Sequence, residues 1–404
     1  MKFSRKEFLK FLGLGVITSR IPQAFAMPSE KMEEAKASTK KTKIRDVEIY
    51  YFDIALVEPF TISLGTVTSS NGILVRVLTD SGIAGIGESC PFQPITGETQ
   101  ETNILVGKNL RDMIRGKDPL AIESILKEFG AFVHTNPGIV AAFDMALYDI
   151  LGKVASLPLF RLLGGDKTTF ETDITTGLNT PENMAKSAKE NLAKGFKTLK
   201  IKVGQDPDLD ILRIQTIRDA IGYDVPIRID ANQGWTVPQA IYALKRMEKF
   251  KIQFVEQPVI SWDISGLKAV RNESPIPVMA DEVLFFPSDA IKLIKAEACD
   301  YFNIKLMKAG GITNALKISH IAESANIRSM LGCMNESRIA LTAAAHLHGA
   351  QKNIIFADLD GYTSHSVDPV IGGMTIKDGM IALPENPGLG VDIDPAFLKK
   401  LRKA

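Results

Sequence analysis

The sequence is poor in features that mark several classes of protein. Only three of its 404 residues are cysteine, Cys90, Cys299 and Cys333, and this odd, sparse set predicts neither a disulfide framework nor a metal-type Cys motif. A strong charge of one sign is also missing, because the net charge is +1 and no basic run occurs beyond the N-terminus. Nucleic acid is therefore not an expected partner, and we expect a small molecule instead.

Long apolar runs are scarce too, which bears on the N-terminus. Residues 1–26 have the pattern of an export signal, with a basic start, an apolar stretch at 8–17 and the cleavage site Ala24-Phe25-Ala26. The start resembles a twin-arginine signal with Lys6 in place of the second arginine. The apolar stretch is too short for a stable membrane span, although an uncleaved anchor is the alternative. We expect a periplasmic protein, free of the membrane after signal removal, with a polar linker at 27–42.

The hydrophobic content of 45% is enough for one large domain and a second, smaller one. Alternating patterns predict strands at 44–54, 73–82 and 83–89, with a hairpin turn between the last two. Helical periodicity follows and ends in a helix rich in small residues at 137–165. These elements predict an α+β capping domain over residues 43–165.

The most regular pattern is a series of five apolar, β-branched runs that each end in a charged side chain. They are TLKIKVG (198–204), IRIDANQGW (227–235), FVEQP (254–258), VMADEV (278–283) and YFNIKLMKAGG (301–311). Their charges follow one another at steps of 28, 26, 25 and 24 residues, about the length of one strand, one helix and two short loops. The repeat predicts consecutive parallel strands with their charges at one end of a barrel.

The charged ends occur in the order Lys202, Asp230, Glu256, Asp281 and Lys305. A parallel strand is buried on both faces, so a charge at its end needs a partner or a ligand. Three carboxylates between two ammonium groups, without His or Cys, favour a hard cation such as Mg2+. Taken singly, each charge could be a helix cap or a surface ion pair, but five at a repeated step indicate one site.

The same pattern sets the limits of the barrel, which we place at 166–368. It begins with FETDITTGL (170–178) and ends with strands within 327–337 and 354–362. The tail at 369–404 carries hairpin and turn signals, and we expect it to complete the capping domain.

On these residues, the chain resembles the enolase superfamily and, within it, the muconate-lactonizing-enzyme subgroup. The similarity is greatest to dipeptide epimerases of the L-Ala-D/L-Glu epimerase type. It covers nearly the whole chain after the signal, including GIGESCPFQPITGET (85–99). The resemblance implies an α/β fold, a modified (β/α)7β TIM-like barrel with an α+β capping domain built from the N-terminal region and the C-terminal tail.

The family's motifs imply a role for each charged residue. Its Lys-x-Lys motif, its opposing lysine and its metal ligands fall on Lys200 and Lys202, on Lys305, and on Asp230, Glu256 and Asp281. The resemblance implies Mg2+-dependent epimerization through an enediolate, with Lys202 and Lys305 exchanging the proton on opposite faces of one carbon. Lys200 would add positive charge near the substrate carboxylate. A lysine is a poor base at neutral pH, so we expect the metal and Lys200 to lower the pKa of the acid/base lysines.

An Asp-x-Asp motif, which dipeptide epimerases carry at the eighth strand, falls on Asp358 and Asp360. Two carboxylates on one face suit the free α-ammonium of a dipeptide, although turn chemistry alone could also explain them. Two further residues, Thr175 and Met334, are expected to touch the substrate.

Outside the coordination sphere we expect Asn232 and Glu282 to orient the site. For substrate preference, the resemblance makes residues 59–70 a loop that closes over the barrel and touches the epimerized residue. An epimerase for C-terminal Glu or Asp is expected to carry a cation there, but residue 65 is glycine and no Lys or Arg occurs from 59 to 74. The peptidoglycan dipeptide L-Ala-D/L-Glu, which export favours, would therefore need a cation from elsewhere, such as Lys308 or Arg338.

Two other functions stay open on the sequence. An N-acylamino-acid racemase or o-succinylbenzoate synthase would share the lysines and the metal but would not need the Asp-x-Asp motif. A non-catalytic exported binding protein could have kept the metal site alone. The sequence also leaves a homo-oligomer open.

Overall fold

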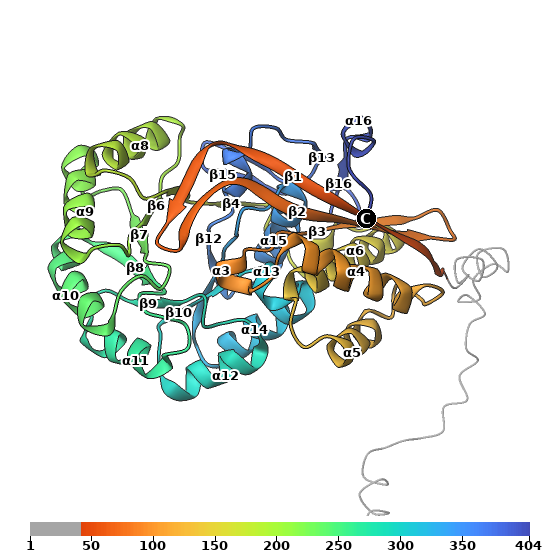
Figure 1. Ribbon diagram of the computed structural model, residues 1–404, viewed down its shortest axis with the longest axis horizontal. Coiled ribbons are helices and arrows are strands. Elements are labelled where there is room, and N and C mark those ends of the chain that lie inside the picture. The colour runs from red at the N-terminus through yellow and green to blue at the C-terminus, as the bar shows by residue number, and fades with distance from the viewer. Residues whose placement is uncertain (1–41) are drawn as a thin grey trace, which may run out of the picture. The chain divides into compact units, whose positions relative to one another are not determined.

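The structure is a computed structural model that describes residues 42–404, so the expected export signal and nearly all of the linker lie outside the described residues. Figure 1 shows two parts in this region, a sheet with helices on one side and a ring of strands surrounded by helices. No helix between residues 42 and 404 combines the length and the apolar character that a membrane span needs.

The cap is built on a long antiparallel hairpin. Strand β1 (Ile44–Ile62) pairs with β2 (Gly65–Thr79), and β2 pairs with β3 (Ala84–Ser89). Our prediction of a loop at 59–70 was wrong, because the two strands stay paired up to the Ile62–Gly65 register. A register shift between Ala55 and Phe60 accommodates the proline at position 59, which has no N–H for the ladder.

Helices pack on this sheet and join it to the barrel. They are α3 (Gln93–Thr96), α4 (Gln100–Ile114), α5 (Ile122–Phe132), α6 (Pro137–Ala155) and α7 (Leu159–Leu162). α6 lies so close to β3 that a Cβ atom at Gly85 or Gly87 would stand 2.0 Å from the carbonyl oxygens of Ala146 and Ala142. These two positions therefore require glycine, which lets the most apolar helix of the cap press on the sheet.

Eight parallel strands form the barrel sheet, and each neighbours the next in sequence. They are β5 (Ile174–Thr176), β6 (Leu199–Lys202), β7 (Ile227–Asp230), β8 (Ile252–Glu256), β9 (Val278–Ala280), β10 (Tyr301–Ile304), β11 (Arg328–Leu331) and β12 (Ile354–Ala357). The N–H of Asp173 donates to the carbonyl of Ala357 at 3.2 Å, which links the first strand to the last.

Helices connect successive strands and cover the outside of the ring (Figure 1). They are α8 (Pro181–Ala193), α9 (Pro207–Ile221), α10 (Val237–Met247), η2 (Glu248–Phe250), α11 (Ile264–Glu273), α12 (Pro287–Ala296), α13 (Leu306–Ala309), α14 (Ile312–Ser324) and α15 (Arg338–Ala350). Seven strand–helix units followed by an eighth strand make a (β/α)7β barrel, so the predicted fold class is confirmed.

The C-terminal tail, which we assigned to the cap, contributes to both parts. It follows η3 (Gly361–Ser364), and its elements are β13 (Val370–Gly372), β14 (Thr375–Lys377), β15 (Met380–Ala382), β16 (Val391–Ile393) and α16 (Pro395–Leu398). The β14–β15 hairpin pairs with β4 (Thr169–Glu171) just before the barrel. The last residue returns to the cap, where the N–H of Ala404 donates to the carbonyl of Ile49 at 2.8 Å.

Candidate active site at the mouth of the barrel

The charged strand ends gather at one edge of the barrel. Lys202 is in register with Asp230, and Asp230 is in register with Glu256. Asp281 and Lys305 each come directly after the last residue of β9 and β10. Because parallel strands carry their carboxyl ends to one edge, the five side chains meet there as the spacing predicted.

Lys200 lies at the centre of the carboxylates. Its Nζ is 2.7 Å from Oδ2 of Asp358, 2.9 Å from Oε2 of Glu256 and 3.1 Å from Oδ2 of Asp230. The residue is 1% exposed. Burial opposes its charge, but the three carboxylates outweigh burial and hold the pKa of Lys200 well above its usual value. Lys200 therefore stays cationic.

Lys202 and Lys305 face each other across the mouth, since β6 and β10 are the second and sixth of eight strands. Nζ of Lys202 donates to Oδ2 of Asp230 at 2.7 Å and to Oδ1 of Asn232 at 2.9 Å. Nζ of Lys305 donates to Oδ2 of Asp281 at 2.9 Å. Two amines thus stand on opposite sides of one space.

The protein groups around Lys305 act on its pKa in both directions, and the part that we expected the metal to play stays a prediction. Burial and, as expected, the charge of Lys200 lower the pKa of Lys305, but the negative charge of Asp281, followed by that of Glu256, outweighs them and raises it. Positive charge among the carboxylates is what would reverse this shift.

Asp230, Glu256 and Asp281 form an oxygen-only donor set from three neighbouring strands. Burial works against the charges of Asp230 and Asp281, but adjacent lysines outweigh it and lower the pKa of both. Burial, and then the charge of Asp230, raise the pKa of Glu256 well above its usual range. Its Oε2 is buried and accepts no hydrogen bond, although Nζ of Lys200 is 2.9 Å away. The residues fit a hard divalent cation, which prefers carboxylate oxygens.

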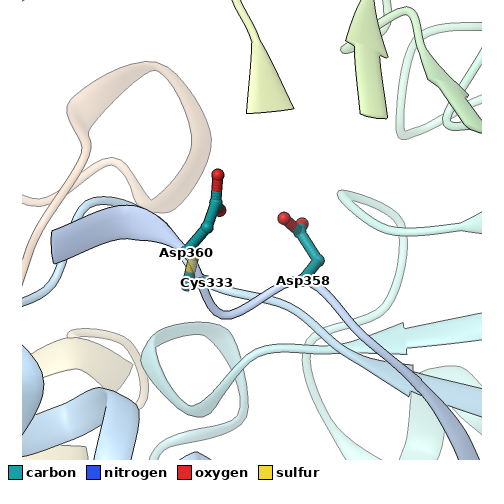
Figure 2. A group of neighbouring side chains, drawn as sticks. All are labelled: Cys333, Asp358 and Asp360. Atoms are coloured by element: carbon teal, nitrogen blue, oxygen red, sulfur yellow. The ribbon is translucent and has the colours of Figure 1, made fainter. Parts of the chain in front are cut away.

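A second acidic group lies beside this one. The side chains of Cys333, Asp358 and Asp360 bring ligand atoms within 4.8 Å of one another (Figure 2). Asp358 is already paired with Lys200, and the N–H of Thr175 donates to Oδ2 of Asp360 at 2.7 Å. Burial raises the pKa of the Cys333 thiol, so it stays neutral and is a poor ligand for a hard metal. This group of side chains is better suited to binding an ammonium group than to binding a second metal ion.

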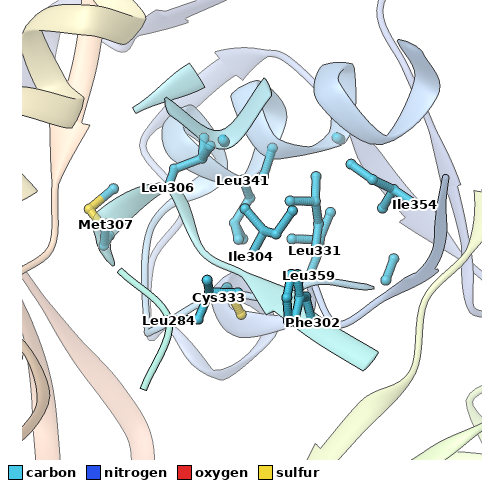
Figure 3. Close-up of a cluster of buried hydrophobic side chains, with 14 of the residues drawn as sticks. Leu284, Phe302, Ile304, Leu306, Met307, Leu331, Cys333, Leu341, Ile354 and Leu359 are labelled. Atoms are coloured by element: carbon cyan, nitrogen blue, oxygen red, sulfur yellow. The ribbon is translucent and has the colours of Figure 1, made fainter. Parts of the chain in front are cut away.

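Leu359 explains why the two aspartates face the same way. It is fully buried and lies in an apolar cluster with Ile304 and Leu331 (Figure 3). Side chains alternate along an extended chain, so anchoring Leu359 in the core turns Asp358 and Asp360 toward the mouth. Thr175, which also donates its hydroxyl to Oδ1 of Asp358 at 3.3 Å, holds them from β5.

Asn232 and Glu282 lie in a chain of hydrogen bonds that leads to Asp230 and Lys202. The N–H of Asn232 donates to Oδ1 of Asp230 at 2.9 Å, and its Nδ2 donates to Oε1 of Glu282 at 3.0 Å. Glu282 therefore acts on Lys202 through Asn232. The backbone here is strained, with φ of 40° at Asn232 and 33° at Gln257, the residue after Glu256.

The tip of the β1–β2 hairpin lies over the mouth, as Figure 1 shows. Oγ of Ser63 is 2.9 Å and 2.8 Å from the carbonyl oxygens of Ala231 and Asn232, to which it donates. The N–H of Leu178 donates to the carbonyl of Thr61 at 2.8 Å. The cap is thus attached to the loops that follow the first and third barrel strands.

Two cavities meet beneath this tip. One, of about 340 Å3, is lined by Lys202 and Lys305 together with the hairpin and α3. The other, of about 370 Å3, is lined by Lys200, Asp358 and Asp360. Lys202, Cys333 and Met334 line both, and Thr175 lines the second, so all residues expected to touch a substrate border this space.

Two residues in the site, Asn303 and Ser63, were missed from the sequence, and a third has another part than the one expected. Lys308 of α13, which we named as a possible cation for the substrate, is buried against the carboxylate of Asp281. Nδ2 of Asn303 donates to Oε1 of Glu256 at 2.8 Å, and Ser63 fixes the hairpin tip. Only Asn303 carried a readable signal, because it stands two residues before Lys305 and so shares its strand face.

Comparison with known proteins agrees with this geometry. Residues 45–164 match the mandelate racemase / muconate lactonizing enzyme N-terminal domain, and residues 183–397 match the enolase C-terminal domain-like family. The L-Ala-D/L-Glu epimerase of Clostridium acetobutylicum is 43% identical over 86% of this chain and 98% of its own length. The hydrophobic dipeptide epimerase of Enterococcus faecalis is 43% identical over 86% and 99%.

Among solved structures, the dipeptide epimerase of Cytophaga hutchinsonii, complexed with Mg and D-Ala-L-Val, superimposes with a TM-score of 0.88. It is 41% identical, and the match covers 90% of this chain and 99% of that one. Both domains of the fold are therefore matched by relatives over nearly their whole lengths. The chain belongs to the mandelate racemase and muconate lactonizing enzyme family of the enolase superfamily.

Proposed function

We propose that the protein is a Mg2+-dependent dipeptide epimerase that inverts the α-carbon of the C-terminal residue of its substrate. The observation that carries this proposal is the placement of Lys202 and Lys305 on opposite sides of one cavity. A second cavity with two carboxylates adjoins it and shares Lys202, Cys333 and Met334 as lining residues. The relatives named above, which act on dipeptides, support the same reaction.

In this reaction one lysine takes the α-proton and the other delivers a proton to the opposite face. Lys202 and Lys305 are the candidates, because each is an amine on a different side of the reacting carbon. Lys200 stays cationic and provides a fixed charge for the substrate carboxylate as negative charge develops. A Mg2+ ion held by Asp230, Glu256 and Asp281 would supply further positive charge to that carboxylate.

Asp358 and Asp360 decide between a dipeptide and an N-acylated amino acid. A dipeptide carries an α-ammonium one residue from the reacting carbon, and the carboxylates in the second cavity can hold it by charge-assisted hydrogen bonds. An N-acyl group has no such charge and would leave Asp360, which has no lysine partner among the described residues, without a cation to bind. This favours dipeptide epimerization over N-acylamino-acid racemization or o-succinylbenzoate synthesis.

Deuterium incorporation tests the proposal. The purified protein is incubated in D2O with Mg2+ and a dipeptide library, and each product is analysed by mass spectrometry and chiral chromatography. We expect one deuterium at the α-carbon of the C-terminal residue, together with the inverted stereoisomer, and loss of both after chelation of the metal. Exchange only with N-succinylamino acids would favour the racemase instead, and exchange with no compound would favour a binding protein.

We also propose that the enzyme is exported and meets peptides released from the cell wall. The support is the residue pattern of the first 26 positions, which lie outside the described residues. Cell fractionation with N-terminal sequencing of the mature protein tests this. A product that keeps its first 26 residues in the cytoplasm would contradict it.

A further inference from the structure

The cavity under the hairpin tip has apolar walls. It lies on the side of Lys202 and Lys305 away from the two aspartates, where the side chain of the epimerized residue must project if the proposed function holds. Its apolar lining comes from β1, β2, the α3 segment and the loop after β11, and includes Phe60, Ile62, Val67, Phe92, Ile95 and Met334. A volume of about 340 Å3 leaves room for a branched aliphatic or an aromatic side chain.

The charges around this cavity disfavour an acidic side chain. The described residues that line it include no arginine and no histidine, and its two lysines are Lys202 and Lys305. Both lysines are paired with carboxylates of the barrel and are needed for proton transfer. Glu101 also lines the cavity, as does Glu98, whose pKa burial raises to about 7, so a substrate carboxylate there would meet acidic groups without a free cation.

Lys308 and Arg338, the two cations that we named as possible partners for an acidic substrate side chain, are already paired with other groups. Lys308 is 1% exposed and bound to Asp281, and it does not line the cavity. The guanidinium of Arg338 donates to Oδ2 of Asp368 at 2.5 Å and to the carbonyl of Val370, also outside the cavity. Neither residue can reach a side chain bound beneath the hairpin.

The acids of the cavity do not form a site for a cationic side chain. Both carboxylate oxygens of Glu98 accept from the N–H of Gly138, at 3.0 Å and 3.3 Å, so this buried residue caps the start of α6. Glu101 is exposed on the first turn of α4. To pair with Glu98, a substrate lysine or arginine would have to displace the N–H of Gly138. To pair with Glu101, it would have to stay in solvent.

We propose that the enzyme prefers dipeptides whose C-terminal residue has an apolar side chain, and that Val67 and Gly65 on the hairpin tip set this preference. The inference rests on the proposed function and specifies its substrate class. The N-terminal residue lies toward Asp358 and Asp360, so the orientation of the dipeptide assigns the apolar cavity to the residue that is inverted. Burial of a leucine-sized side chain, against repulsion of a carboxylate, predicts a preference of roughly 100-fold or more in kcat/KM.

A matched series of L-Ala-Xaa dipeptides, with Xaa as Leu, Phe, Glu or Lys, tests the wild-type preference. We expect deuterium exchange in the order Leu or Phe far above Lys and Glu. Faster exchange with Glu or with Lys would overturn the inference while leaving the epimerase function in place. If no exchange occurs with any of these four dipeptides or with any other dipeptide, both the inference and the proposed function are overturned.

Two variants convert the preference and identify the residues that set it. Val67→Lys places an ammonium in the cavity on a regular strand, and Gly65→Arg does so at the turn. Gly65 has φ of 136°, a conformation that strains any other residue, so Gly65→Arg could fail to fold. Val67→Lys introduces no such strain and tests the inference by itself. Each should lower kcat/KM for L-Ala-Leu by roughly 10-fold or more and raise it for L-Ala-Glu by a similar factor.

Thr68→Lys is the matched control, because Thr68 is the next residue on β2, is exposed and does not line the cavity. It adds the same charge to the same strand on the opposite face. Its Leu-to-Glu ratio should equal that of the wild type. A ratio that changes as much in Thr68→Lys as in Val67→Lys would show a general charge effect and overturn the assignment to the cavity.

Discussion

Nζ of Lys200 lies 2.7 Å from Oδ2 of Asp358, so an ion pair joins the second strand of the barrel to the residue after the eighth. Asp358 therefore shares its charge between a lysine and any ammonium that enters. Asp360 has no lysine partner among the described residues, and burial, followed by the charge of Asp358, raises its pKa to about 7. The two aspartates are thus unequal, and Asp360 is the one free to respond to a substrate.

Replacing Asp360 by asparagine should weaken dipeptide binding. The change removes the charge opposite the α-ammonium, and a hydrogen bond to a charged group contributes about 1.5–3 kcal/mol, so KM should rise roughly 10- to 100-fold. Steady-state kinetics measure this, and kcat should change little because both acid/base lysines remain. Titration calorimetry with Mg2+ provides the control, and an equal loss of metal affinity would show that Asp360 serves the metal instead.

The pH dependence of KM should report the same residue. A raised pKa means that Asp360 is protonated below about pH 7 and gains its charge above it. KM for a dipeptide should therefore fall as the pH rises through about 7, as long as the substrate keeps its ammonium. Kinetics of Asp360→Asn over the same range should lack this step. Retention of the step in the variant would assign it to another group.

Lys202→Ala and Lys305→Ala should each abolish epimerization, because the proton must leave one face and return on the other. Loss of a general acid or base costs roughly 10^2- to 10^4-fold in kcat. Each variant should still exchange the α-proton of one stereoisomer, and the two variants should act on opposite stereoisomers. NMR in D2O with each pure isomer measures this. Residual exchange of the same isomer by both variants would place the amines on one face.

Glu282→Ala should lower kcat through Asn232, which lies between Glu282 and Lys202. Loss of one hydrogen bond costs about 1 kcal/mol, so a fall of roughly 5- to 10-fold is expected, with KM nearly unchanged. Glu282→Gln keeps an acceptor for Nδ2 of Asn232 and should restore most of the rate. Equal rates for Glu282→Ala and Glu282→Gln would show that the hydrogen bond from Asn232 to Glu282 does not affect catalysis.

Asp144 should make stability depend on pH. It accepts hydrogen bonds at the start of α14, including one from Oγ1 of Thr313 at 2.7 Å, yet burial raises its pKa to about 7. The folded state keeps this proton after the unfolded state has lost it, so stability is greatest below the unfolded value of 3.8 and falls as the pH rises to about 7.

Urea unfolding at several pH values checks this prediction. Each pKa unit corresponds to about 1.4 kcal/mol, so a decline of a few kcal/mol is the upper bound for Asp144. Asp144→Asn should flatten the decline, and the same change at the exposed Asp166 should not. Equal pH profiles for wild type and Asp144→Asn would assign the dependence to other buried acids.

The sequence by itself determined the barrel and the five charges at its mouth. Alternation along a strand and the nearly constant step between Lys202, Asp230, Glu256, Asp281 and Lys305 are local properties, and they fix which side chains reach the same edge. The family resemblance pointed to the Asp-x-Asp pair, and the apolar Leu359 between the two aspartates agrees with their lying on one face.

Only the tertiary structure decided how these groups are paired and what covers them. The resemblance implied a loop at 59–70, but β1 and β2 stay paired there, with a register shift at Pro59, and the hairpin extends over the mouth. The contact of Lys308 with Asp281 joins α13, which follows β10, to the end of the neighbouring strand β9, and no periodicity in the sequence predicts it. Ion pairs and cavity walls depend on distances between segments that are far apart in the chain. The chemistry of the site could therefore be predicted from the sequence, but its selectivity could not.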